Sequence, residues 1–357
     1  MGETVRRHGG DIHGFAFSAR VRPEDVTDFS ASINPLGAPR TVMKAIKERL
    51  RDIEHYPDPE ARQLKEKLSE VHRTDRSLIL CGNGCTELIY LLPCVMPFNR
   101  VLIPGPTFIE YELACKAARP ECAIIYHRLD ERNGFLIDPV GLIGSAARLN
   151  ADAVFLCNPN NPTGRLAERR DLDEAAAIAA KRKIYLIVDE SFIEFTSAAS
   201  MAELVVKNPY LIVLRSMTKF YALPGLRLGW GVFPARMIKA LTGRKQPWSV
   251  NALAQTAGIA ALDERDFREK TIRYITKQKE FLKAGLDRLG IEYVPSDANY
   301  HLLRSRSAPR IIEGLKERNI LVRDCSGFKG LDKRYIRIAV KKKKENETLL
   351  EHAARYA

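Results

Sequence analysis

Three residues that could act on a carbonyl group each follow a short apolar run in this 357-residue chain. Lys219 follows the run YLIVLRS, Asp189 ends the run IYLIVD, and Asn158 comes directly after AVFLC. A lysine amine forms a Schiff base with an aldehyde once it has lost its proton. A carboxylate at the end of a buried strand needs a partner, because its desolvation is costly. Taken singly, each residue also fits an ordinary loop or turn; taken together, they indicate carbonyl chemistry.

Two further segments have the residue types of a phosphate site. In LCGNGCTELI an apolar run is followed by a glycine-rich turn and a helical pattern. The backbone amides of Gly84, Cys85 and Thr86 would then lie at a helix N-terminus, where anions bind. Ser216 and Arg227, on either side of Lys219 in SMTKFYALPGLRLGW, are also suited to hold a phosphate. Neither segment has the GxGxxG or Walker spacing, so each is a weak signal alone.

The elements that must position these residues are strands. Seven apolar runs alternate with helical patterns, and each run is continuous, which is typical of strands buried on both faces. They are SLILCG, RVLIP, AIIYHRL, AVFLCNP, IYLIVDE, YLIVLRS and RLGWGVF. This alternation predicts an α/β fold, with a large domain whose mostly parallel seven-stranded sheet is covered by helices on both faces. Ligands of such sheets bind beyond the carboxyl ends of the strands.

The pattern changes after Pro234. Long helical stretches lead into the shorter runs IEYVPS, ANYHLLR, ILVRDC and YIRIAV, which predict a smaller α+β C-terminal domain. We therefore expect three parts: an N-terminal segment (1–50) that packs on the small domain and the active site, a large domain (51–234) and a small domain (235–357).

Composition limits the partners. Lys and Arg number 57 against 44 Asp and Glu, a net charge of +13 that fits either a nucleic acid or a small anionic substrate. The one dense basic run, KKKK at 341–344, is typical of a solvated helix face, so we expect no nucleic acid. The seven cysteines have no metal-ligand spacing, and we expect no metal. No run could span a membrane and no export signal is evident, which favours the cytoplasm.

A single ligand would satisfy all four strand-end loops: one with a phosphate, a phenolic oxygen, a pyridine nitrogen and an aldehyde, which is pyridoxal 5'-phosphate. The NPNNPTG turn, the VDE strand and the SMTK…GLRLG segment resemble those of the fold-type I pyridoxal-phosphate enzymes of the aspartate aminotransferase superfamily. The resemblance extends over essentially the whole chain. It implies the fold-type I architecture, this cofactor, and a homodimer with shared active sites.

The resemblance also implies a role for each residue. Lys219 would bind the cofactor aldehyde and shuttle the proton, Asp189 would pair with the pyridine nitrogen, and Asn158 would bond the phenolic oxygen. Phe108 would stack on the ring. The cofactor phosphate would be held by Gly84, Cys85, Thr86, Ser216, Arg227 and, from the neighbouring subunit, Tyr56.

For the substrate, the resemblance implies that Arg337 clamps the α-carboxylate, a bidentate role suited to a guanidinium. Arg323 is the natural second cation, and Asn158 also contacts the substrate. His8 and Asn34 could fold over the site and close it. A loose terminal histidine and a surface ion pair remain the alternatives for His8 and Arg323.

Two branches of that superfamily compete. RRHGGDIHGFAF followed by DFSASINPLGAP resembles the opening of the L-threonine-O-3-phosphate decarboxylases of cobalamin biosynthesis. Phe192, where many relatives carry a tyrosine, also fits that branch better. The resemblance implies a carboxy-lyase that forms (R)-1-amino-2-propanol O-2-phosphate and CO2. A histidinol-phosphate or related aminotransferase, and a decarboxylase of O-phospho-L-serine, stay open. A regulator that merely holds the cofactor is disfavoured, because no helix-turn-helix pattern precedes the cofactor domain.

Overall fold

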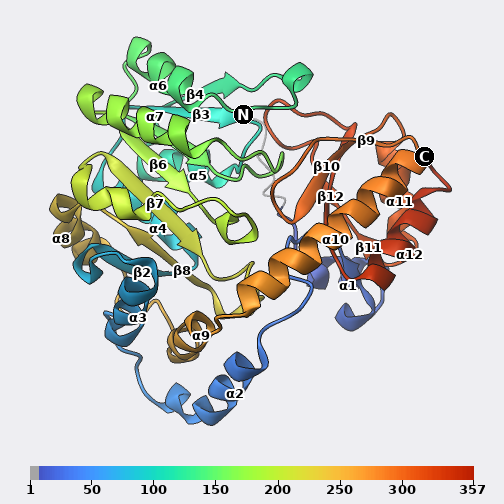
Figure 1. The fold of residues 1–357 in the computed structure, drawn as a ribbon, viewed down its shortest axis with the longest axis horizontal. Coiled ribbons are helices and arrows are strands. Elements are labelled where there is room, and N and C mark those ends of the chain that lie inside the picture. The colour runs from blue at the N-terminus through green and yellow to red at the C-terminus, as the bar shows by residue number, and fades with distance from the viewer. Residues whose placement is uncertain (1–7) are drawn as a thin grey trace.

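The larger of the sheets has seven strands in the order β2-β8-β7-β6-β5-β3-β4, in a computed structural model that describes residues 8–357 (Figure 1). They are β2 (Ile79–Asn83), β3 (Arg100–Gly105), β4 (Ala123–Arg128), β5 (Ala153–Cys157), β6 (Tyr185–Asp189), β7 (Leu211–Ser216) and β8 (Leu228–Val232). Only β8 runs against its neighbours β2 and β7, and the other pairs are parallel. The predicted seven-stranded, mostly parallel sheet is confirmed.

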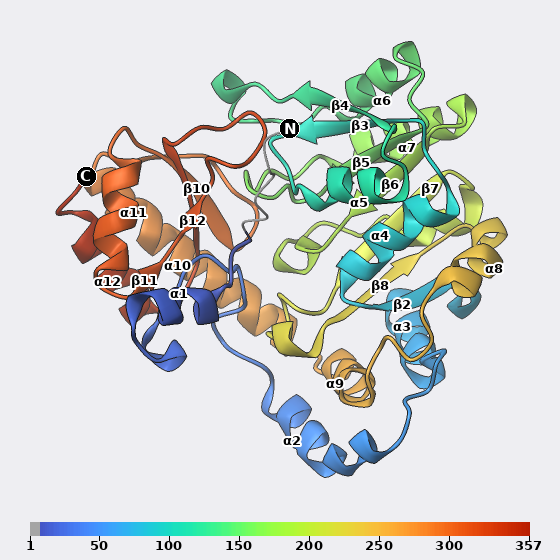
Figure 2. The same cartoon turned by 180° about the vertical axis from the view of Figure 1, so that it is seen from behind.

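Helices cover both faces of this sheet (Figures 1 and 2). One core packs α3, α6, α7 and α9 against one face, and a second packs α4, α5 and α8 against the other. Successive strand residues alternate between the two cores: Val154 and Leu156 belong to the first, Phe155 to the second. The helices are α3 (Arg62–His72), α4 (Cys85–Val95), α5 (Glu110–Ala118), α6 (Pro139–Arg148), α7 (Arg169–Arg182), α8 (Ala235–Arg244) and α9 (Ala252–Leu262).

A smaller antiparallel sheet, in the order β12-β13-β10-β9, forms the second domain with three helices. Helix α10 runs from the edge of the large domain across the small one (Figure 1). A separate apolar core, which includes Ile275, Ile311, Ile338 and Leu349, lies between helices and sheet. The elements are β9 (Glu292–Tyr293), β10 (Tyr300–Arg304), β12 (Arg323–Asp324), β13 (Tyr335–Ala339), α10 (Phe267–Arg288), α11 (Ala308–Lys316) and α12 (Lys343–Ala353).

The N-terminal segment divides its contacts between the two domains. After α1 (Ile12–Ala19), strand β1 (Thr27–Asp28) pairs in parallel with β11 (Ile320–Leu321), and the Ala339 amide donates to the Phe29 carbonyl at 2.9 Å. Helix α2 (Arg40–Glu48), in contrast, packs against α9 of the large domain. The first half of the segment therefore builds the small domain and the second half the large one.

The predicted boundary at residue 234 falls earlier than the packing places it. Helices α8 and α9 follow this boundary in sequence, yet Met237 and Leu241 lie in one core of the large sheet and Ala254 and Ala257 in the other. The sequence pattern changes where the strands of the large sheet end. The core of that sheet still needs two more helices to cover it, and the chain supplies them afterwards.

Candidate active site

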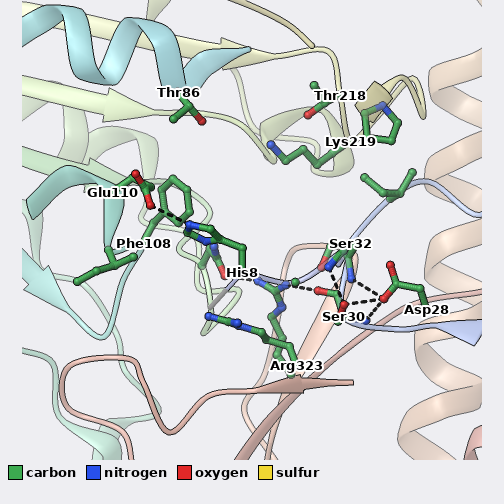
Figure 3. Close-up of a pocket in the computed structure, with 18 of the residues that line it drawn as sticks. His8, Asp28, Ser30, Ser32, Thr86, Phe108, Glu110, Thr218, Lys219 and Arg323 are labelled. Carbon is green, nitrogen blue, oxygen red and sulfur yellow. Dashed lines mark hydrogen bonds and ion pairs between the residues drawn. The ribbon is translucent and has the colours of Figure 1, made fainter. Parts of the chain in front are cut away.

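A cavity of about 960 Å³ lies between the carboxyl ends of the large sheet and the small domain (Figure 3). The loops after β2, β3, β5, β6 and β7 form one wall, through Thr86, Phe108, Asn161, Phe192 and Lys219. The opposite wall comes from three stretches far apart in sequence: residues 8–10, 28–33 and 323–337. The volume of the cavity is at the upper end of the range for small-molecule sites, which is enough for a cofactor and a small substrate together.

Lys219 lies in the turn that follows β7. Its Nζ donates to Ser216 Oγ at 3.4 Å and lies 5.8 Å from the centroid of the Phe192 ring. Burial lowers the pKa of Lys219, although the negative charge of Asp189 opposes the shift. Desolvation disfavours the ammonium form, so the amine is closer to its neutral, nucleophilic form than a surface lysine is.

Asp189 is buried at the end of β6, and two donors orient its carboxylate. Tyr111 donates its hydroxyl to Oδ2 at 2.8 Å, and the Ser191 amide donates to Oδ1 at 2.9 Å. Burial and the neighbouring Asp189 raise the pKa of Tyr111 well above its usual value, so the phenol keeps the proton that it donates. Sequence reasoning missed Tyr111, which is separated from Asp189 by 78 residues.

The turn before α4 forms a cradle with Arg227. Gly84 caps the helix with φ +76°, and a Cβ there would lie 2.6 Å from Nη2 of Arg227. The guanidinium therefore approaches the helix N-terminus only because residue 84 is glycine. Thr86 faces the cavity from the first turn. The Cys85 thiol stays neutral, because burial raises its pKa well above the usual value.

These residues fit pyridoxal phosphate. The glycine-opened cradle joins the N-terminus of α4 to a guanidinium, and both are donors suited to a phosphate. The Gly84 amide is not one of the free donors predicted, because it donates to the Gly82 carbonyl at 2.8 Å. The side-chain oxygen of Asn158 accepts from the Ala167 amide at 2.8 Å, so its Nδ2 is the end that can donate to a phenolic oxygen. Asp189 and Lys219 supply the carboxylate and the amine within one connected region, since the charge of Asp189 acts to raise the pKa of Lys219 against the effect of burial.

Two arginines of the small domain face each other across paired strands. Arg323 of β12 stands opposite Arg337 of β13 in the register, so both side chains project from the same face of the sheet, and both line the cavity. Arg337 is 6 % exposed, donates to the Ser30 carbonyl at 2.6 Å and also bonds Asn161 Oδ1. Its Nε has no hydrogen-bond partner among residues 8–357. This arrangement can bind two anionic groups.

Of the three remaining predicted residues, His8 lies at the cavity, whereas Asn34 and Tyr56 do not. His8 lines the cavity, and its Nε2 lies 2.8 Å from Oε1 of Glu110. Asn34 does not line it: its Nδ2 donates to the Phe220 carbonyl at 2.8 Å and to Thr271 Oγ1 at 2.9 Å. A role for Asn34 in closing over the substrate does not fit this geometry. Tyr56 is 81 % exposed and lies against Trp248, away from this chain's cavity.

Apart from Asn34 and Tyr56, the predicted residues form two groups around one cavity. Those that line it are His8, Thr86, Phe108, Lys219, Arg227, Arg323 and Arg337. Those that lie beside the lining residues are Gly84, Cys85, Asn158, Asp189 and Ser216. Sequence reasoning missed Glu110 and Asn161, whose partners are remote in sequence. Within residues 8–357, no helix is long and apolar enough to cross a membrane, and no cluster of His, Cys, Asp and Glu could hold a metal ion.

Comparison with known proteins gives consistent matches along the chain. Threonine-phosphate decarboxylase of Salmonella typhimurium is 39 % identical, over 96 % of this chain and 94 % of that protein. Two crystal structures are each 30 % identical to this chain. L-threonine-O-3-phosphate decarboxylase from Porphyromonas gingivalis has a TM-score of 0.83, over 93 % of this chain and 99 % of that chain. Histidinol-phosphate aminotransferase from Clostridium acetobutylicum has a TM-score of 0.85, over 92 % of this chain and 98 % of that chain. The model of the family "Aminotransferase class I and II" matches residues 24–352. The chain with this sheet, this lysine and this cradle belongs to the aminotransferase class I and II family.

Proposed function

We propose that the chain is a pyridoxal-phosphate-dependent decarboxylase that converts L-threonine O-3-phosphate to (R)-1-amino-2-propanol O-2-phosphate and CO2, for the aminopropanol linker of cobalamin. The observation that carries the proposal is the pair of opposed guanidinium groups, Arg323 and Arg337, in a cavity that His8 also lines. A phosphorylated amino acid brings two anions, which need two cations. The identity to the Salmonella decarboxylase supports the same reaction.

The residues that would hold the cofactor come from the large domain. Lys219 would bind its aldehyde, Asp189 would stabilise the protonated pyridine nitrogen, and Asn158 would donate to the phenolic oxygen. The cradle of Gly84 and Arg227 would take the phosphate. The group supplies, when bound, an electron sink for the electron pair of the bond that breaks at Cα.

The chain's own residues then decide which bond breaks. Arg337 would bind the α-carboxylate, and Arg323 with His8 would bind the phosphate. Held at both ends, the substrate would present its carboxylate, rather than the proton on Cα, as the group that leaves. Lys219, whose pKa burial has lowered, holds at Nζ the proton that replaces the carboxylate at Cα. Phe192 has no hydroxyl to donate and contacts Lys219 only through its ring.

We further propose a homodimer whose two active sites are shared. The exposed apolar side chains of one side of the large domain support it: Leu50 is 52 % exposed, Ile53 67 % and Trp248 46 %. Tyr56 lies in this patch, where it would reach the phosphate of the partner's cofactor. Apolar patches of this kind mark protein interfaces. Light scattering behind a sizing column tests the dimer, and a monomeric mass would overturn it.

The reaction is tested by supplying L-threonine O-3-phosphate alone to cofactor-loaded protein. We expect CO2 over many turnovers, with the visible spectrum of the enzyme restored afterwards. A parallel assay with O-phospho-L-serine, which lacks the methyl group of threonine phosphate, measures the contribution of that methyl group to kcat/KM. The 30 % identity to the Clostridium aminotransferase makes transamination the second candidate. Absence of CO2 together with conversion of the cofactor to its amine form by L-glutamate would establish transamination instead.

A further inference from the structure

Glu110 is a buried carboxylate on the cavity wall that the proposed chemistry does not use. It is the first residue of α5, is 4 % exposed and lines the cavity. Its Oε1 lies 2.8 Å from Nε2 of His8, and its Oε2 accepts from the Tyr90 hydroxyl at 2.5 Å. Burial of a carboxylate is costly unless it is bonded, so this position has a specific requirement for its partners.

Among the described residues, Glu110 bonds side chains from two distant parts of the chain. Tyr90 lies on α4 of the large domain, whereas His8 begins the strap, by which we mean residues 8–34. Figure 3 shows His8 between Glu110 and Arg323 of the small domain. The strap also reaches the large domain at its other end, where the Asn34 amide donates to the Lys219 carbonyl at 3.0 Å. The His8–Glu110 contact is therefore the anchor of the strap's first residues.

Next to His8, the backbone of the strap is linked through Ser30 to Arg337. The Gly10 amide donates to Ser30 Oγ at 2.7 Å, and Arg337 donates to the Ser30 carbonyl at 2.6 Å. A Cβ on Gly9 would lie 2.2 Å from that same carbonyl oxygen. The backbone next to His8 is thus packed directly on the group that holds Arg337.

We propose that Glu110 is a positioning residue, which orients His8 toward the phosphate end of the substrate and is itself held by Tyr90. The inference rests on the proposed function for the identity of the substrate. By accepting from Nε2, Glu110 fixes the orientation of the imidazole and turns Nδ1 away from itself. When both ring nitrogens carry a proton, the Nδ1–H can then donate to a phosphate oxygen. Orientation of this kind contributes to affinity by reducing the rotamers that the ligand must fix.

The test compares four variants with the wild type: Glu110→Gln, Tyr90→Phe, His8→Ala and the double variant Glu110→Gln/His8→Ala. We expect Glu110→Gln to raise KM for L-threonine O-3-phosphate about tenfold, as for the loss of one charge-assisted hydrogen bond, with kcat changed much less. The visible spectrum of bound cofactor stays unchanged. The double variant should lose no more than His8→Ala alone, because Glu110 acts through His8.

Glu112→Gln is the matched control. Glu112 lies on the same helix and accepts from the Tyr126 hydroxyl at 2.6 Å, but it does not line the cavity. Its variant should retain the wild-type KM. An equal effect of Glu112→Gln, an unchanged KM in Glu110→Gln, or additive losses in the double variant would each overturn the proposal.

A further readout separates this inference from the proposed reaction. Spectral titration of the cofactor-loaded protein with L-threonine O-3-phosphate and with L-threonine requires no CO2 release. We expect Glu110→Gln to weaken the response to the phosphorylated amino acid about tenfold and to leave that to L-threonine unchanged. If decarboxylation fails but this difference is seen, the role of Glu110 stands and the reaction is wrong. Equal weakening toward both amino acids would overturn the role of Glu110.

Discussion

The two walls of the cavity are built in different ways. On the wall of the large domain, Lys219, Phe192 and Asn161 lie three or four residues after the end of a strand, so the sheet itself places them. On the opposite wall, His8 and Arg323 are brought together only by long-range contacts such as the β1–β11 pair. In the function proposed above, the first wall would hold the cofactor and the second would face the substrate. Cofactor binding would then depend on local chain geometry and substrate choice on tertiary structure.

The largest effect should come from the wall of the large domain. Lys219→Ala removes the amine that we propose binds the cofactor and moves the proton, so we expect turnover to fall by at least about 10³-fold. The visible absorption of the bound cofactor should disappear as well. A CO2 assay and an absorption spectrum check both statements. Retention of the spectrum would mean that another lysine binds the cofactor.

The opposite wall should show its largest effect at Arg337. Arg337→Ala removes the carboxylate clamp and leaves the Ser30 carbonyl without this donor, so kcat/KM should fall on the order of 100-fold. The spectrum should remain, since the cofactor contacts lie on the other wall. Arg304→Ala is the control: it lies on β10 of the same sheet, 39 % exposed and paired with Glu292. Loss of the visible spectrum of bound cofactor in Arg337→Ala would contradict the assignment of cofactor and substrate to separate walls.

A smaller effect should follow at the cradle. Gly84→Ala places a Cβ within 2.6 Å of Arg227, at φ +76°, so both the guanidinium and the backbone must shift. We expect the Kd for pyridoxal phosphate to rise about tenfold with little change in KM for the substrate. Gly134→Ala, at φ +68° with nothing within 4 Å, isolates the backbone strain. Equal effects of the two substitutions would exclude a specific role for the cradle.

The last prediction concerns stability rather than activity, and it is made for a buried histidine of the small domain. Burial lowers the pKa of His301 on β10 to about 3, the largest cause being desolvation. Because the unfolded chain takes up a proton near pH 6.5 and the folded one does not, stability is full above that pH and falls toward pH 3, at about 1.4 kcal/mol per unit. His301→Leu should reduce the drop in Tm between about pH 7 and pH 5. An unchanged drop would exclude His301 as its source.

The sequence allowed the first wall to be predicted more fully than the second. Continuous apolar runs identified all seven strands, and Lys219, Asp189 and Asn158 were found because they lie at strand ends. Tyr111 and Glu110 were missed, since a tyrosine or glutamate early in a helix has no pattern that reveals a partner on another segment. Asn34 was assigned to the substrate from its place in a motif, but its amide bonds Phe220 and Thr271.

The pairing of Thr27 with Ile320 has a consequence for the synthesis of the protein. Strand β1 leaves the ribosome early, whereas β11 follows almost 300 residues later. At typical elongation rates of about 5–20 residues per second, β1 waits on the order of 15–60 s for its partner. The large sheet, whose strands all lie between residues 79 and 232, can form during this interval. The wall of the large domain can therefore form before the opposite wall is complete.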